Sequence, residues 1–272
     1  LPMLANKAVL NRETGTVKNL SWPIYGQPKI DGFRCVSRVS DGAALFSRTN
    51  IAYVGFSSMR DRLNKLVLPT KGFGSGRFHL DGEFFVDTED FSQLSSLIKK
   101  GQHHAEYDLA ELQYRVFDCF DLNHMDAPYS ERYAFLEKLL TPGDPVHLLE
   151  VVTMNCMDDV DLRMGQFLEE GHEGLMLRDP TSPYVLRKRS KYLQKHKEFH
   201  DDEFVIVGYK SAHSADAGTV VWQCAVNVGV PKGYTIFASD DDYAFWVRPK
   251  GVRAQRREWF EHAETYLGKH LT

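Results

Sequence analysis

The sequence predicts an antiparallel-rich α+β domain followed by a smaller, β-rich domain. Strand and helix patterns alternate irregularly over about the first 200 residues, which argues against a doubly wound parallel sheet. Asp41-Gly42 separates two alternating runs and is a strong hairpin signal. Near His200 the chain changes to β-rich runs and one amphipathic helix, so we place the domains at residues 1–199 and 200–272.

Hydrophobic periodicity and turn residues locate the elements of the first domain. The expected strands are 33–39, 43–48, 78–86, 112–120 and 146–153, and the expected helices are 56–66, 91–100, 130–140 and 160–170. Ser130 is expected as an N-cap, and Gly101 and Gly171 are expected to end the helices before them.

The second domain offers strands at 203–210, 219–228 and 234–237 and a helix at 253–267. Trp259, Ala263 and Tyr266 share one face of this helix, and Gly268 would cap it. Five short strands with a helix would form a small OB-fold β-barrel, and three of those strands are clear.

The composition is that of a globular chain and excludes several classes of protein. Of 272 residues, 43% are hydrophobic and 26% charged, and no apolar run reaches the about 18 residues of a membrane span. The four cysteines form no CxxC pair, so we expect neither a zinc site nor a disulfide framework. A reducing, intracellular compartment fits this cysteine usage best.

Local basic patches must carry any argument for nucleic-acid binding, because the net charge is −4. The densest patch is 187–197, where six of eleven residues are Lys or Arg. A second patch comprises Arg248, Lys250, Arg253, Arg256 and Arg257.

The hexapeptide from Lys29 to Arg34, KIDGFR, is the most informative stretch. It places a primary amine, a carboxylate and a guanidinium within six residues. Such a set can attack a phosphorus atom, with Lys29 as the nucleophile. The alternative is a solvated lysine at the entry of a hairpin.

A pair of carboxylates forms a second candidate site. Alternation from Phe78 to Val86 puts Asp81 and Glu83 on one face of a strand, opposite the apolar face. These two side chains can bind a ribose or a metal. The alternative is the polar outer face of an edge strand.

Further motifs follow the hexapeptide in a fixed order. They are Ser47-Arg48, Asp81-Gly82-Glu83, Val116-Phe117-Asp118, Glu173-Gly174 and Lys195-His196-Lys197. This order resembles the covalent nucleotidyltransferase superfamily, and most closely the ATP-dependent DNA ligases of the small viral and phage type. The resemblance implies an adenylation domain at 1–199, an OB-fold domain at 200–272 and, for a viral protein, a location inside the host cell.

The resemblance also implies a reaction in three steps that seals nicked duplex DNA. Lys29 attacks the α-phosphate of ATP, AMP passes to a DNA 5′-phosphate, and the adjacent 3′-hydroxyl displaces AMP. Mg²⁺ (or Mn²⁺), Lys195 and Lys197 would favour the neutral amine and neutralise phosphoryl charge. Asp31 would either orient Lys29 or hold a metal-bound water.

The same resemblance implies that further residues would bind the nucleotide and the metal. Arg34 and Arg48 would contact phosphate or ribose, and Gln27 also belongs to the ATP-binding set. Phe117 would stack on adenine, unless it is a core aromatic of a buried strand. Glu83 would accept hydrogen bonds from the ribose, and Glu173 with Glu83 would serve the metal.

Contacts with DNA are the last implication. Phe91 resembles a position that packs near the nick, with a core-helix residue as the alternative. Arg187, Lys188, Arg189 and Lys191 are candidates for DNA contact, with a solvated loop as the alternative. We expect a monomer that does not bind membranes.

Other functions stay open at this point. An RNA ligase or an mRNA-capping guanylyltransferase would share the fold, and a non-catalytic nucleic-acid clamp would share the β-barrel and the basic loops. The basic motif that ends the OB domain in the resembling family has no counterpart before Thr272. We therefore expect that the C-terminal part of the second domain is missing from this sequence.

Overall fold

The chain forms two compact units, Leu1–Glu198 and Phe199–Thr272. The computed structural model describes residues 1–87, 91–197, 202–226 and 243–272. Within these ranges, no helix combines the length and the apolar character needed to cross a bilayer.

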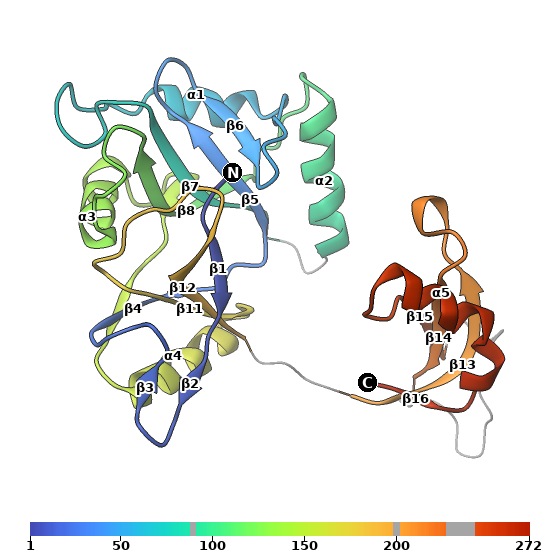
Figure 1. Ribbon diagram of the computed structural model, residues 1–272. Helices are drawn as coiled ribbons and strands as arrows, with labels where there is room; N and C mark the ends of the chain where they lie inside the picture. The colour runs from blue at the N-terminus through green and yellow to red at the C-terminus, as the bar shows by residue number, and fades with distance from the viewer. Residues whose placement is uncertain (88–90, 198–201, 227–242) are drawn as a thin grey trace. The chain divides into compact units, whose positions relative to one another are not determined.

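The first unit contains two five-stranded sheets, which we name sheet I and sheet II (Figure 1). Sheet I has the order β1 (Leu4–Lys7), β12 (Arg189–Lys197), β11 (Gly174–Arg178), β4 (Ile24–Pro28), β10 (Val152–Met154). Sheet II has the order β6 (Ala44–Ser47), β5 (Phe33–Arg38), β7 (Phe78–Phe85), β8 (Gln113–Asp121), β9 (Val146–Leu148). A small ribbon of β2 (Leu10–Asn11) and β3 (Thr16–Val17) lies apart from both.

The predicted antiparallel-rich α+β architecture of this unit is confirmed. Only β1–β12 and β8–β9 are parallel pairs in the described part of the chain. The predicted hairpin joins β5 to β6, with Arg38 opposite Ala44. Asp41 and Gly42 both have positive φ, 59° and 90°, which is the geometry that Asp-Gly favours in tight hairpin turns.

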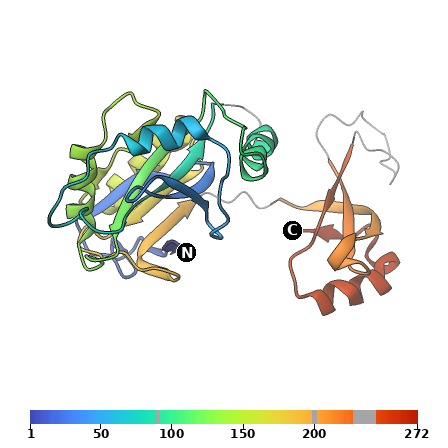
Figure 2. The ribbon, with the colours of Figure 1, turned by 90° about the horizontal axis from the view of Figure 1, so that it is seen from above.

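Four helices cover the sheets. They are α1 (Ser57–Asn64), α2 (Phe91–His103), α3 (Tyr129–Leu139) and α4 (Met157–Glu169). Figure 2 shows α1 lying across one face of sheet II, and its Met59 and Leu63 belong to the core of that sheet. α4 covers sheet I through Val160 and Met164.

A third apolar cluster lies where the two sheets meet. Met3, Val36, Phe120, Tyr184 and Leu193 are its buried members. They come from both sheets, because Val36 and Phe120 lie on β5 and β8 while Leu193 lies on β12. Among the described residues no strand of one sheet pairs with a strand of the other, so these side chains hold the two sheets together.

The carboxylate strand is central, and the edge-strand alternative for Asp81 and Glu83 is wrong. β7 pairs with β5 on one side and with β8 on the other. Asp81 is only 1% exposed, and a register shift against β8 falls between Asp81 and Gly82. A bulge of this kind re-aims side chains locally.

Several predicted element boundaries differ from the structure. The run 146–153 divides into β9 in sheet II and β10 in sheet I, because Val146 and Met154 enter different cores. Ser130 is not an N-cap: Pro128 precedes the helix, and the Ser130 N–H donates to the carbonyl of Pro180. The helix that we expected at 160–170 begins earlier and ends before Gly171, as expected.

Gly101 does not end α2, which continues to His103. The ring of the fully buried Phe56 lies against this glycine, and a Cβ there would overlap it. The Gly55 N–H also donates to the carbonyl of Gly101. Tertiary packing therefore requires glycine at a position that sequence alone assigns to a helix stop.

The second unit contains a four-stranded sheet of order β15-β14-β13-β16. Its elements are β13 (Phe204–Ser211), β14 (Val220–Ala225), β15 (Ala244–Val247), β16 (His270–Leu271) and α5 (Arg253–Glu261). The described strands do not close into a barrel. The expected strand at 234–237 and the end of 219–228 lie outside the described residues, and β15 was not predicted.

The helix of the second unit has the expected apolar face. Ala263 is buried in the core with Ile206 and Trp222, and Trp259 and Tyr266 pack against it. The α-helix is shorter than expected, because a 3-10 turn, Ala263–Tyr266, replaces its last part before Gly268.

Two helical glycines provide a test of this packing. Gly101→Ala should destabilise the protein by about 1–3 kcal/mol, because the methyl group overlaps Phe56. Gly165→Ala in α4 meets no atom within 4 Å and should be neutral or stabilising, since alanine is the better helix former. Thermal unfolding of both variants checks this; a Gly101→Ala protein as stable as Gly165→Ala would contradict it.

Candidate active site

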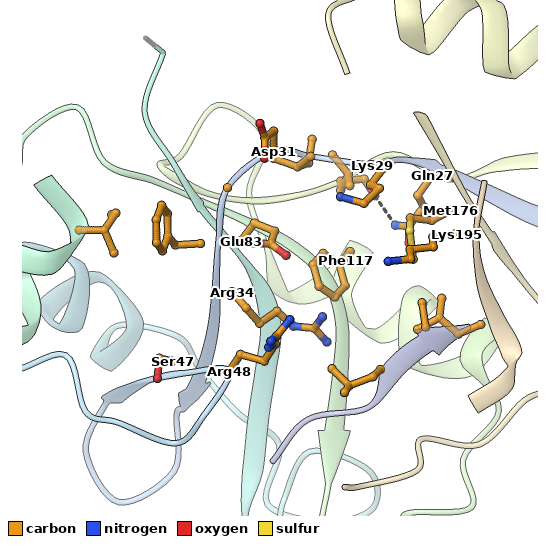
Figure 3. Close-up of a pocket in the computed structure, with 18 of the residues that line it drawn as sticks. Gln27, Lys29, Asp31, Arg34, Ser47, Arg48, Glu83, Phe117, Met176 and Lys195 are labelled. Atoms are coloured by element: carbon orange, nitrogen blue, oxygen red, sulfur yellow. Dashed lines mark hydrogen bonds between the residues drawn. The ribbon is translucent and has the colours of Figure 1, made fainter. Parts of the chain in front are cut away.

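A cavity of about 600 Å³ opens between the two sheets of the first unit (Figure 3). Nine of the residues predicted from the sequence line it: Gln27, Lys29, Asp31, Arg34, Arg48, Glu83, Phe117, Arg189 and Lys195. In Figure 3 the side chains of Lys29, Glu83 and Lys195 surround Phe117. Residues far apart in the chain therefore meet in one place.

Lys29 lies where the chain passes from sheet I to sheet II. β4 ends at Pro28 and β5 begins at Phe33. The Lys29 N–H donates to the carbonyl of Gly174 (2.8 Å), and the Glu173 N–H donates to the carbonyl of Lys29 (3.0 Å). The solvated-hairpin alternative for Lys29 is therefore wrong, since its backbone is fixed against β11.

Glycine at position 32 has a steric reason. A Cβ there would lie 2.6 Å from the backbone oxygen of Phe84. The link between Lys29 and β5 consequently passes too close to β7 for any side chain.

Glu173 contacts two of the lysines that the sequence predicts for the site. Its carboxylate forms ion pairs with the Nζ atoms of Lys29 and Lys197, the latter at 2.7 Å. Burial acts to raise the pKa of Glu173, but the hydrogen bonds and charges of Lys197 and Lys29 outweigh it and lower that pKa. Glu173 is therefore held as a carboxylate beside the Lys29 amine.

The surroundings of Lys195 disfavour its charged form, whereas those of Glu173 favour the carboxylate. Burial lowers the pKa of Lys195, and the positive charges of Lys197 and Lys29 lower it further. Three lysines concentrated at one end of a cavity favour a polyanionic ligand such as a triphosphate.

Asp31 faces the same carboxylate. Burial raises the pKa of Asp31, and the negative charge and hydrogen bond of Glu173 add to this rise. Two carboxylates in contact form a donor set that fits Mg²⁺, which accepts carboxylate and water oxygens. No cluster of three or more His, Cys, Asp or Glu occurs among the residues that the structure describes.

Glu83 projects from β7 directly opposite Arg34 in the strand pairing. Burial raises the pKa of Glu83 to about 7, against the lowering charges of Arg34 and Lys29. Its ionisation therefore falls within the physiological range of pH.

Arg34 is engaged by a neighbouring carboxylate. Its Nε and Nη2 atoms both donate to Asp81 at 2.6 Å, and Nη2 also donates to the carbonyl of Met3 (3.1 Å). The guanidinium carbon lies 4.7 Å from the centre of the Phe117 ring. The structure thus shows Arg34 supporting Phe117, while its contact with phosphate or ribose stays a prediction.

Phe117 is half-buried and lines the cavity, so the fully buried core alternative is wrong. Its carbonyl accepts a hydrogen bond from the hydroxyl of Tyr129 (3.0 Å). Gln27 lies nearby, with Nε2 donating to the carbonyl of Leu149 (3.2 Å). Arg48 follows β6 and is exposed at the rim.

The candidates for DNA contact are only partly in a loop. Arg189 and Lys191 lie on β12, whereas Arg187 and Lys188 lie in the exposed turn before it, and contact with DNA stays a prediction for all four. Arg189 lines the cavity and donates to the carbonyl of Ala5 (2.6 Å). Phe91 begins α2, and its side chain lies outside the described part of the chain.

Sequence reasoning missed several residues that line the cavity. Met176 and Arg178 follow Gly174 at a spacing of two on β11, and this alternation was a usable signal. Lys99 and Gln102 come from α2, and no local pattern connects this helix with the Lys29 motif.

Glu83 gives a pH-dependent prediction. The unfolded chain releases this proton near pH 4.5 and the folded chain near 7. Between these values the folded state binds more protons, so its stability falls as pH rises and levels off above about 7. Glu83→Gln removes the free-energy cost of ionising a buried carboxyl group. This variant should raise the unfolding temperature at pH 8 by about 3 °C or more.

The gain of Glu83→Gln should shrink at pH 5, and Glu137→Gln on the exposed face of α3 should show no such pattern. Calorimetry at the two pH values measures this. An equal difference at both pH values would contradict the burial of Glu83.

Comparisons with known proteins identify the family of the chain. The model of the family "ATP dependent DNA ligase domain" matches residues 2–197. The DNA ligase of African swine fever virus (strain Badajoz 1971 Vero-adapted) is 29% identical over 207 residues, which is 73% of this chain and 47% of the viral protein. The chain spans about half the length of the curated relatives it matches.

Solved structures share the fold. Pmar-Lig_Pre is similar with a TM-score of 0.71 at 18% identity, over 99% of this chain and 61% of that one. The ATP-dependent DNA ligase of bacteriophage T7, solved in complex with ATP, gives 0.57 at 18% identity, over 99% and 91%. With the family model matching most of its length, the chain belongs to the ATP-dependent DNA ligase domain family.

Proposed function

We propose that the chain is an ATP-dependent DNA ligase that seals nicks in duplex DNA through a covalent lysyl-AMP on Lys29. The observation that carries this proposal is the ion pair of Lys29 with Glu173 beside Lys195 and Lys197, at the edge of a cavity of about 600 Å³. A nucleophilic amine, a carboxylate and cations for phosphate are thereby combined with Phe117 for a base.

The first step forms a bond between Nζ of Lys29 and the α-phosphorus of ATP. The bond from that phosphorus to the bridging oxygen breaks, pyrophosphate leaves, and the amine gives up a proton. An amine attacks only with its lone pair free, so the Lys29 ammonium that pairs with Glu173 must first release a proton to solvent. AMP then passes to the 5′-phosphate, and the 3′-hydroxyl displaces it.

The neighbouring residues act on charge and position. Lys195 and Lys197 neutralise the phosphoryl oxygens as negative charge develops on them. Glu83 accepts hydrogen bonds from the ribose hydroxyls, and Phe117 stacks on the adenine, with Gln27 at the same end of the cavity. Arg34 and Arg48 contact the ribose or a phosphate.

Glu173 and Asp31 would hold Mg²⁺, and Glu83 is a further candidate ligand. The ion would supply charge neutralisation on phosphoryl oxygen. Burial and Glu173 raise the pKa of Asp31, so a cation held by these residues would stabilise its carboxylate form.

We assign residues 1–199 as the adenylation domain and 200–272 as an OB-fold domain. The four-stranded sheet with α5 supports the second assignment in part. Nicked duplex DNA is the proposed partner of a monomeric enzyme, with Phe91, Arg187, Lys188, Arg189 and Lys191 as contact candidates. Contacts to the DNA backbone carry no sequence information directly, so we expect no base-sequence preference.

A labelling assay tests the covalent step. Incubation with Mg²⁺ and α-labelled ATP should leave acid-labile label on the denatured protein, and nicked duplex DNA should discharge it. Lys29→Ala should abolish the label, whereas Lys138→Ala on the exposed side of α3 should retain it. Label from GTP in place of ATP would indicate capping, and discharge only by nicked RNA would indicate an RNA ligase. No label from either nucleotide would refute the covalent mechanism.

A second experiment tests the metal ligands. Removal of Mg²⁺ by a chelator should abolish labelling. Glu173→Gln and Asp31→Asn should each raise the Mg²⁺ concentration for half-maximal labelling by about tenfold or more, because each removes one anionic ligand. Glu150→Gln, an exposed residue after β9, is the matched control. Unchanged Mg²⁺ dependence in both site variants would contradict the assignment.

A further inference from the structure

A buried ionic unit adjoins the cavity and takes no part in the chemistry above. Asp118 on β8 accepts hydrogen bonds from Nε (2.8 Å) and Nη2 (3.0 Å) of Arg132 on α3, and from Nη1 of Arg178 on β11. All three side chains are at most 4% exposed. We name these three residues the Arg–Asp–Arg unit.

The unit connects the two sheets where no backbone bonds do so. β8 belongs to sheet II and β11 to sheet I, and no strand of one sheet pairs with a strand of the other in the described residues. The separation of these two strands therefore depends on side chains between them.

Asp118 and Arg178 are each close in sequence to a residue that lines the cavity. Phe117 directly precedes Asp118, and its carbonyl is held by the Tyr129 hydroxyl at 3.0 Å. The Arg178 guanidinium lies 4.0 Å from the centre of the same Tyr129 ring. Met176 lies two residues before Arg178 and so on the same face of β11. Both Phe117 and Met176 line the cavity.

Stabilisation of the fold alone does not explain the Arg–Asp–Arg unit. It buries two guanidinium groups against one carboxylate, and Nε of Arg178 has no hydrogen-bond partner among the residues that the structure describes. Buried charges of this kind often stabilise less than apolar residues of the same volume. Arg132 fixes its position further by donating to the carbonyls of Ala127 (2.6 Å) and Ser182 (2.9 Å). The unit therefore fixes the positions of β8, β11 and α3 relative to one another more than it stabilises the folded state.

We propose that the Arg–Asp–Arg unit sets the separation of Phe117 and Met176 and thereby the affinity of the site for a purine base. The inference rests on the proposed function, because it takes the cavity to hold the AMP part of ATP. Stacking of one base on an aromatic side chain changes affinity by roughly five- to 150-fold, so a small change in spacing has a measurable effect. Arg178 lines the cavity, whereas Asp118 and Arg132 are not among its lining residues. We treat all three as positioning residues because their charged groups are held to one another and not to Lys29.

Arg178→Lys is the main test. Lysine keeps the charge but lacks the planar fork that contacts Asp118 and packs on Tyr129. The KM for ATP in self-adenylation should rise about tenfold, with kcat changed by less than about twofold. In a Lys29→Met background, which prevents the covalent step, AMP affinity should fall about tenfold and inorganic tripolyphosphate affinity should not change.

Two further variants separate positioning from general damage. Tyr129→Phe removes only the hydroxyl that holds the Phe117 carbonyl, and it should raise the KM for ATP by about threefold. Leu63→Ala in α1 removes buried apolar atoms away from the cavity, and it should lower the unfolding temperature without changing that KM. If Arg178→Lys does not fold, Tyr129→Phe decides.

An unchanged KM in Arg178→Lys or Tyr129→Phe would overturn the inference. Equal losses of AMP and tripolyphosphate affinity would also overturn it, because they indicate collapse of the whole site. A wild-type protein that takes no label from ATP would refute the proposed function. Normal labelling with an unchanged KM in the variants would refute only the positioning role.

Discussion

The site depends on two backbone hydrogen bonds between the Lys29 segment and the start of β11. They join Lys29 to Gly174 and Glu173 where the chain leaves sheet I for sheet II. Gly174 has a φ of +145°, and a Cβ there would collide with the carbonyl of His196, so only glycine permits this approach. The Glu173 carboxylate then reaches both Lys29 and Lys197, the last residue of the neighbouring strand β12. The remaining site residues are arranged around this junction.

Acidic and basic side chains lie close together in the cavity. Burial and neighbouring lysines lower the pKa of Lys195, whereas burial and Glu173 raise the pKa of Asp31, and burial raises the pKa of Glu83 to about 7. Each shift disfavours the charged form of the group in the unliganded protein. A polyanionic nucleotide would relieve the lysines, and a divalent cation would relieve the carboxylates, which is the electrostatic reason for assigning both ligands to this site.

Local patterns predicted the elements that local forces determine. The Asp41-Gly42 hairpin and the buried face of β7 followed from turn chemistry and period-two alternation, and the Lys29 motif indicated where the cavity lies. Tertiary packing decided the rest. The ring of Phe56 requires Gly101 inside α2, and two cores divide the run from Val146 to Met154 between two sheets. Lys99 reaches the cavity from α2, whose own sequence does not indicate the approach.

The central claim is a covalent bond between AMP and Lys29. The most direct test is peptide mass spectrometry of the protein after incubation with ATP and Mg²⁺, without DNA. We expect one AMP on the peptide that contains Lys29, at the Lys29 side chain, and its loss when nicked duplex DNA is added. AMP on another lysine, or an unmodified Lys29 in protein that seals nicks, would contradict it.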